Sequence, residues 1–399
     1  MAVENHILTK DFPQFDGGLS IWPDPQDFKA LAARADAPTT LKDLLSGDTP
    51  QISLHITSFA NATFVAILWP HTLMDMMSQQ AFLQAWSLVL EGRESEVPPV
   101  LGAHEDALFA ASEGKPGEYI LKSKQLKGSS MIKFAARFAW DMLCGPTPKT
   151  RTICLPERIM ASLRLQARMD ITGSVSGEKE PIRGEKELSV SGEKHSFISD
   201  GDVLTAWAIR AVATSLPRPR PMTAMHAMNA RFRLPSLSRT PGVYIQNMIV
   251  PACTFLSAEA ALEPLGMIAL SNRQHLAEEA TEAQVLASLR EQYQSKDPSK
   301  LFYSDADALL MPFSNWTRAD ILRTVDFSAA VLRAGDTRQS RRNPPGTPIF
   351  HHASLTKQRR TTRLGVVILG KDHEENYWLT MTLPPRAWKK IKHSLQGLY

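Results

Sequence analysis

The sequence has few cysteines and no long apolar run. Its three cysteines are odd in number and are not spaced as metal ligands, so we expect ordinary thiols in a reducing compartment. They are Cys144, Cys154 and Cys253. No stretch approaches the roughly 18 uninterrupted apolar residues of a membrane helix, because even the most apolar segment, 131–143, is interrupted by Lys133 and Arg137.

The sequence also lacks a charge excess. A net charge of +4, with 22% charged residues, gives no sign of a nucleic-acid binder. Residues 1–10 carry no basic segment followed by an apolar run, so we expect no secretory signal. The 399 residues, 43% of them hydrophobic, are enough for two domains. These properties predict a soluble cytoplasmic monomer that acts on neither nucleic acid nor membrane.

A predicted hairpin and helix surround His71. Residues 51–57 alternate polar and apolar side chains, which predicts a half-buried strand. Residues 63–69 are continuously apolar, which predicts a central strand buried on both faces. A helix is expected from Asp75 to about Leu90. Its expected buried residues are Phe82, Trp86, Val89 and Leu90.

The remaining elements are interspersed, which indicates an α/β class. Helices are predicted at 27–35, 131–143, 155–169, 202–212, within 258–296, and from Trp388 onward. Strands are predicted near 15–22 and at 222–229, 243–251, 321–327, 364–369 and 377–383.

One segment differs from the rest in composition. Residues 174–179, Ser-Val-Ser-Gly-Glu-Lys, recur as residues 189–194, and aromatic residues are absent from 173–195. Such a segment buries too little apolar surface to offset its ordering entropy. We therefore expect a flexible linker at 173–197, between an N-terminal domain (1–172) and a C-terminal domain (198–399).

His71 stands where a strand gives way to a helix, a position suited to proton transfer. Asp75, four residues later, lies within reach of the same helical face. A metal site would need a third ligand, which no neighbouring His or Cys supplies. A Ser-His-Asp hydrolase would need a Gly-x-Ser-x-Gly elbow, which is missing. The nearby methionines Met74, Met76 and Met77 are interpreted as core or pocket lining.

The His71-x-x-x-Asp75 spacing resembles the signature of the BAHD acyltransferases, which share the chloramphenicol-acetyltransferase-like fold. Further segments resemble that family in the same order along the chain. They are 198–207, Asn-Ala-Arg-Phe-Arg at 229–233, Tyr-Ile-Gln-Asn at 244–247, Ser-Asn-Trp at 314–316 and Asp-Phe-Ser at 326–328. The wording around Pro70 and Met76 is closer to fungal members that act in secondary metabolism.

The resemblance implies two similar α/β domains with an active-site channel between them. It implies acyl transfer from acyl-CoA, a co-substrate, to a hydroxyl or amine of a small metabolite, without a bound cofactor or metal. His71 would be the general base, and a neutral imidazole suits that role at neutral pH. Asp75 would point away from the substrates and pair with Arg231, as structural support.

Two departures from the family pattern are present. Ser328, Ala329 and Ala330 replace a Gly-Trp-Gly, so that only Asp326 and Phe327 of that motif survive, downstream of Trp316. In the family this motif lies near the coenzyme channel, so the departure puts the grip on coenzyme in doubt. His71 also comes earlier in the chain than is usual, which suggests shortened or replaced first strands.

Other interpretations stay open at this point. A decayed acyltransferase fold could act as a non-catalytic binding protein. A carrier-protein-dependent condensation enzyme would normally open the motif with two histidines, and Pro70 takes the first place here. A basic stretch at 331–363, with eight Lys or Arg residues against Asp336, suits coenzyme phosphates, but we interpret it as a solvated loop in preference.

Overall fold

The computed structural model describes residues 2–7, 9, 19–22, 29–33, 36–114, 117–176, 197–297, 301–332, 343–353 and 362–396. Its strands are β1 (Ser20–Trp22), β2 (Ser53–Ser58), β3 (Thr63–Leu68), β4 (Val100–Leu101), β5 (Lys149–Leu155), β6 (Met222–Asn229), β7 (Val243–Tyr244), β8 (Ile249–Leu256), β9 (Leu309–Asn315), β10 (Gly365–Lys371) and β11 (Tyr377–Leu383). Its α-helices are α1 (Lys29–Ala32), α2 (Leu41–Leu45), α3 (Met76–Leu90), α4 (Ala107–Ser112), α5 (Gly128–Cys144), α6 (Glu157–Ser176), α7 (Asp200–Ala213), α8 (Pro235–Ser238), α9 (Leu265–Glu279), α10 (Glu282–Gln294), α11 (Ile321–Thr324) and α12 (Pro385–Gln396).

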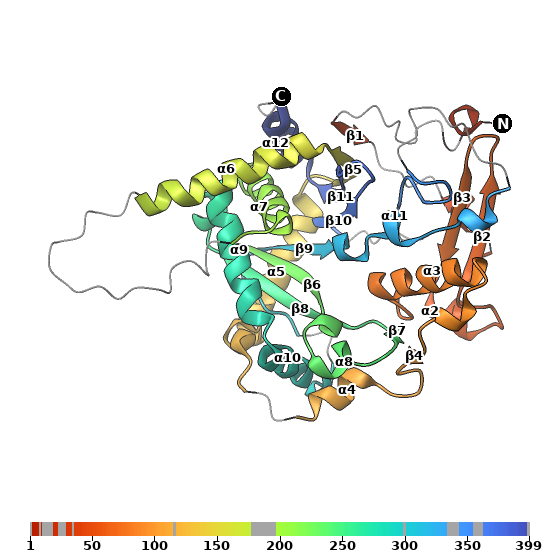
Figure 1. Cartoon of the computed structure of the whole chain (residues 1–399). Helices are drawn as coiled ribbons and strands as arrows, with labels where there is room; N and C mark the ends of the chain where they lie inside the picture. The colour runs from red at the N-terminus through yellow and green to blue at the C-terminus, as the bar shows by residue number, and fades with distance from the viewer. Residues whose placement is uncertain are drawn as a thin grey trace, which may run out of the picture.

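A seven-stranded sheet in the order β1-β5-β11-β10-β9-β6-β8 forms the centre of the larger unit (Figure 1). Strands β6, β9 and β10 run parallel to one another, and the other neighbours are antiparallel. Helices α6, α7, α9 and α12 pack together beside this sheet. Their apolar faces and the sheet enclose the main core, whose members include Leu204, Leu379 and Trp388.

Helix α7 shows how the local sequence produces this packing. Ser199 caps the helix by accepting from the backbone of Asp202, and the Asp202 side chain accepts from the backbone of Ser199 in return. Nearly every residue that follows is buried, including Val203 and Trp207. The apolar composition on all sides places this helix inside the core, between its neighbours α6, α9 and α12.

The smaller unit contains the β2–β3 hairpin and α3, to the right of the large sheet in Figure 1. The predicted hairpin is confirmed, but the expectation that residues 63–69 form a central strand is wrong. Strand β3 pairs with β2 in a two-stranded sheet, and its side chains alternate between exposed and half-buried along the first half. In α3, Leu83 is buried, whereas Val89 and Leu90 are 46% and 36% exposed, against expectation.

Two other predicted strands need correction. Residues 321–327 do not form a strand, because α11 occupies Ile321–Thr324 after Asp320 adopts a left-handed conformation (φ 43°). Residues 243–251 do not form one continuous strand, because residues 245–248 leave the ladder between β7 and β8. That break has a functional reason, given below. The predictions at 222–229 and 377–383 are confirmed as β6 and β11.

The predicted linker falls largely outside the described residues. Residues 173–176 form the end of α6, Phe197 is described, and 177–196 are not. The division into 1–172 and 198–399 stays a prediction, and strand pairing crosses it, because β5 pairs with β11. Along the described parts of the chain, no helix combines the length and apolar character needed to cross a membrane.

A buried acid, Glu279, lies at the end of α9 away from the cavity described below. It is 3% exposed, and both of its carboxylate oxygens lie 3.0 Å from the backbone nitrogen of Cys253, which donates to them. Burial raises the pKa of Glu279 to about 8, and the charge of Glu278 adds to this, whereas the Cys253 N–H acts in the opposite direction. The folded protein therefore holds a proton here that the unfolded chain releases at lower pH.

We expect Glu279→Gln to raise the melting temperature more at pH 8 than at pH 5. With a raised folded pKa, stability falls as pH rises from the ordinary value of 4.5 to about 8, and the neutral amide removes that loss. Thermal melts at both pH values, with exposed Glu278→Gln as control, measure the effect. An equal shift at both pH values, or a lower melting temperature at pH 8, would contradict the assignment.

Candidate active site

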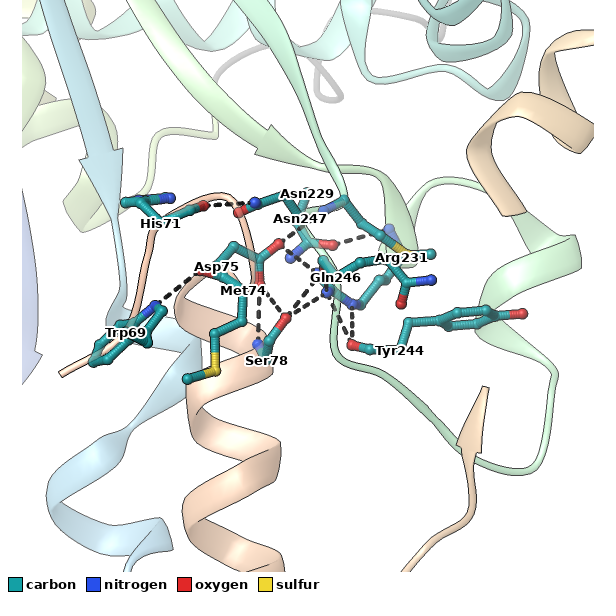
Figure 2. Close-up of polar contacts among 11 residues, drawn as sticks. Trp69, His71, Met74, Asp75, Ser78, Asn229, Arg231, Tyr244, Gln246 and Asn247 are labelled. Carbon is teal, nitrogen blue, oxygen red and sulfur yellow. Dashed lines mark hydrogen bonds and ion pairs between the residues drawn. The ribbon is translucent and has the colours of Figure 1, made fainter. Parts of the chain in front are cut away.

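The backbone around His71 is held at several points. After β3, Leu73 N donates to Pro70 O at 2.8 Å and closes a turn, and Trp69 Nε1 donates to Met74 O at 3.2 Å. Asn247 Nδ2 donates to His71 O at 2.7 Å from the segment between β7 and β8. Figure 2 shows the imidazole pointing away from this network. The backbone is thus anchored while the side chain is exposed.

Asp75 begins α3 and receives four hydrogen bonds. Ser78 N and Ser78 Oγ donate to Asp75 Oδ1 at 3.0 and 2.9 Å, as in an N-terminal cap. Met248 N and Arg231 Nη1 donate to Asp75 Oδ2 at 2.9 and 2.8 Å. Burial alone would raise the pKa of Asp75, but the charge and hydrogen bond of Arg231, with the amides of Met248 and Ser78, lower it overall.

Arg231 joins three segments that are distant in sequence. It lies in the short helix η6 (Ala230–Phe232), after β6, where its backbone N donates to Asn229 Oδ1. Its guanidinium donates to Asp75, to Ser78 Oγ at 2.8 Å, and to the carbonyls of Tyr244 and Gln246. Strand pairing breaks at 245–248 because these backbone groups bind Arg231 and Asp75 instead (Figure 2). The structure therefore brings Asp75 and Arg231 together, beneath the turn that carries His71.

Gln246, which stands where the family pattern has glycine, has a specific neighbour. Its Nε2 donates to Gly102 O at 2.8 Å. Gly102 has φ +67°, and a Cβ there would lie 2.4 Å from Gln246 Nε2. A glycine at 102 therefore accommodates the larger side chain at 246, and the two positions close this side of the network.

A cavity of about 2100 Å³ separates the small unit from the sheet. His71 and the end of β3 line one side of it, and the C-terminal ends of β6 and β9 line the other. Those two strands run parallel, with His226 paired to Phe313, so the segments that follow them emerge at the same edge. Trp316 also lines the cavity, and its Nε1 donates to Ser314 Oγ at 2.7 Å.

Sequence reasoning gave no role to His226, which lines the cavity from β6. Its ring stacks on Phe313 at a centroid distance of 5.2 Å, and its Nε2 is buried without a partner among the described residues. Burial lowers the pKa of His226 to about 4, although the Asn272 side chain and the charge of Asp202 oppose this. His226 is therefore uncharged at neutral pH. Its position within the apolar pattern of β6 is typical of a core residue, so the sequence held no signal for it.

Asp326 and Phe327 lie with α3 and not beside His71. Asp326 N donates to Ser87 Oγ at 3.0 Å, and Asp326 Oδ1 accepts from Ser328 N at 2.7 Å. The Phe327 ring packs edge-on against Trp86, with centroids 5.0 Å apart. The two surviving motif residues thus attach the segment after α11 to α3. Trp316 is the motif residue that reaches the cavity.

Most of the basic stretch at 331–363 cannot be placed. Residues 333–342 and 354–361 lie outside the described residues, and both interpretations of the stretch stay predictions. Its last member, Arg363, is described, and Arg363 Nη2 donates to Pro146 O at 2.7 Å.

Comparisons with known proteins agree on one kind of protein with one exception. No family model matches the chain. O-acetyltransferase PaAT-2 of Phomopsis amygdali is 32% identical, over 100% of this chain and 80% of the relative. A protein of Penicillium decumbens named transcriptional regulator calD is also 32% identical, over 99% of this chain and 78% of the relative. Several other fungal relatives of about 30% identity are named acetyltransferases.

Among solved structures, TRI101 of F. graminearum, complexed with coenzyme A and T-2 mycotoxin, is similar with a TM-score of 0.57. The match covers 86% of this chain and 67% of TRI101, at 15% identity, and shows a shared fold. The α/β architecture and the order of the motifs along the chain are consistent with that fold.

Proposed function

Because this chain belongs to the BAHD-like acyltransferases of fungi, an acyl-CoA-dependent enzyme family with a two-domain α/β fold, we propose that it acetylates a hydroxyl or amine of a small secondary metabolite with His71 as general base. The observation that carries this proposal is the exposed imidazole of His71 on the wall of the large cavity. The acetyl group is proposed because relatives are named acetyltransferases.

The proposed chemistry conserves every proton. Neutral His71 takes the proton from the acceptor hydroxyl or amine as its oxygen or nitrogen attacks the thioester carbonyl. The tetrahedral intermediate then collapses, the C–S bond breaks, and the imidazolium returns the proton to the departing thiolate. No acyl-enzyme is required, because the cavity is large enough to hold donor and acceptor together.

The role proposed for Asp75 is indirect. Its carboxylate is engaged by Arg231, Ser78 and Met248, so it does not face the substrates. It holds the start of α3 against the 245–248 segment, and Asn247 of that segment holds the carbonyl of His71. Together these contacts aim the imidazole. Acyl-CoA is proposed as co-substrate, and no bound cofactor is needed for this chemistry.

Acyl transfer can be tested by incubating the protein with acetyl-CoA and a panel of alcohols and amines. Thiol release should depend on the acceptor, and mass spectrometry should detect the acetylated acceptor. Acyl-CoAs of increasing chain length would show which acyl group is preferred. Thiol release at the same rate without any acceptor would indicate hydrolysis and contradict the proposal.

A second candidate is a non-catalytic binding protein, favoured by the name of the P. decumbens relative and by the eroded 326–330 motif. It predicts that coenzyme or metabolite binds without turnover. A third, a condensation-type transferase, predicts turnover only with an acyl-carrier-protein donor. Supplying that donor in parallel with acetyl-CoA separates the three functions.

A further inference from the structure

Three arginines from different elements line the cavity. Arg233 follows η6 at the end of β6, Arg318 lies in η9 (Thr317–Ala319) at the end of β9, and Arg273 is on α9. Strands β6 and β9 are parallel neighbours, so the segments that carry Arg233 and Arg318 leave the sheet at the same edge. Arg231, which binds Asp75 below His71, is two residues from Arg233. The cluster thus belongs to the same cavity as His71.

The charges in this cluster are unequally compensated. Arg273 pairs with Asp202, with Nε to Oδ2 at 2.9 Å, and donates to Ser199 Oγ at 2.7 Å. Arg233 and Arg318 have no acidic partner among the residues that the structure describes. The guanidinium of Arg318 instead stacks over the Phe232 ring, 3.4 Å from its centroid. Stacking orients this guanidinium but leaves its hydrogen-bond donors available.

The arginines are close enough to affect each other. Burial lowers the pKa of Arg233, and the positive charges of Arg318 and Arg273 lower it further. Like charges at this spacing repel, and the repulsion is relieved when an anion binds between them. Guanidinium groups hold phosphate oxygens through paired N–H donors, in a geometry that suits phosphate better than a single point charge does.

We propose that Arg233 and Arg318 bind phosphate groups of the acyl-CoA substrate. The inference rests on the proposed function, which requires acyl-CoA, and it names the residues that grip the part of that molecule farthest from the thioester. The cavity of about 2100 Å³ is larger than the roughly 300–1,000 Å³ typical of small-ligand pockets, as a long donor beside an acceptor requires.

Binding measurements by calorimetry can test this without turnover. The ligands are CoA, 3′-dephospho-CoA and pantetheine, and the variants are Arg233→Met and Arg318→Met. Each variant should weaken CoA binding by about tenfold or more, because a charge-assisted hydrogen bond contributes at least that factor. Pantetheine, which has no phosphate, should bind all variants equally. Arg239→Met, at an exposed arginine outside the cavity, is the matched control and should bind CoA normally.

The remaining comparisons locate the phosphate and exclude a structural effect. If 3′-dephospho-CoA binding is insensitive to the substitutions, the 3′-phosphate is the ligand, and if it is equally weakened, the diphosphate is. Lysine at either position should restore part of the affinity. Melting temperatures should stay equal or rise, because repulsion is removed.

Some outcomes would overturn the inference. Normal CoA affinity in both methionine variants would do so, as would pantetheine binding that weakens as much as CoA binding. These results are distinct from failure of the proposed function. In that case, the wild-type protein would show no acyl transfer with any acceptor, whereas an error in the phosphate assignment leaves acyl transfer intact while the arginine variants bind CoA normally.

Discussion

Replacing His71 by alanine should lower kcat for acetyl transfer by about 10²- to 10⁴-fold, the usual contribution of a general base. The reason is chemical, because no other cavity residue stands at the same turn with an exposed imidazole. The fold should survive, since the imidazole is exposed and the anchoring hydrogen bond from Asn247 reaches the carbonyl, which alanine retains. Affinity for CoA should also be unchanged.

Steady-state kinetics, thermal melting and CoA binding together decide the role of His71. His55→Ala is the matched control, because His55 lies on β2 of the same unit and is not among the cavity-lining residues. If His71→Ala keeps wild-type kcat, the general base lies elsewhere. His226, whose pKa is lowered to about 4, would then be the next histidine to replace, and its low pKa would move the acidic limb of the rate profile downward.

The elements with strong local signals could be predicted from sequence. Strands 222–229 and 377–383 and the cap at Ser199 follow from side-chain period and capping chemistry, which act within a few residues. The burial of residues 63–69 could not be predicted, because it depends on whether neighbouring strands exist on both sides. The exposure of Val89 has the same cause, since no other element covers that end of α3.

The site divides in the same way. His71 and Asp75 are four residues apart, so a short motif carries their relation, and its resemblance to a known family extends it to Arg231. The roles of Asn247 and Ser78 need the fold, because Asn247 reaches His71 across 176 residues of sequence and Arg231 reaches Ser78 across 153. The break at 245–248 is also a tertiary effect, since those backbone groups leave the ladder to serve Arg231 and Asp75.

Asp75→Asn should destabilise the fold by about 3–5 kcal/mol and reduce activity with it, because it leaves Arg231 largely buried without its counter-charge. The two side chains are 6% and 11% exposed, and their ion-pair distance is 2.8 Å. Denaturant unfolding and kcat measure the two effects. Glu96→Gln, which breaks the exposed Arg93–Glu96 pair, is the control and should cost no more than about 1 kcal/mol.

A double-mutant cycle tells apart a lost ion pair from a lost helix cap. Asp75→Asn combined with Arg231→Met should cost less than the sum of the single changes, because each single change leaves one buried charge unpaired and the double leaves none. If only the cap to Ser78 mattered, the two effects would add.

The pH dependence gives an independent sign. The folded pKa of Asp75 is lowered from its ordinary 3.8, so its contribution to stability is present above about pH 3.8 and is lost as pH falls through the lower, folded value. The stability gap between wild type and Asp75→Asn should therefore stay constant near neutrality and close only in strong acid. Normal activity together with normal melting in Asp75→Asn would refute the view that this carboxylate positions His71. A variant that melts normally but is inactive would instead point to a carboxylate that acts on the substrates directly.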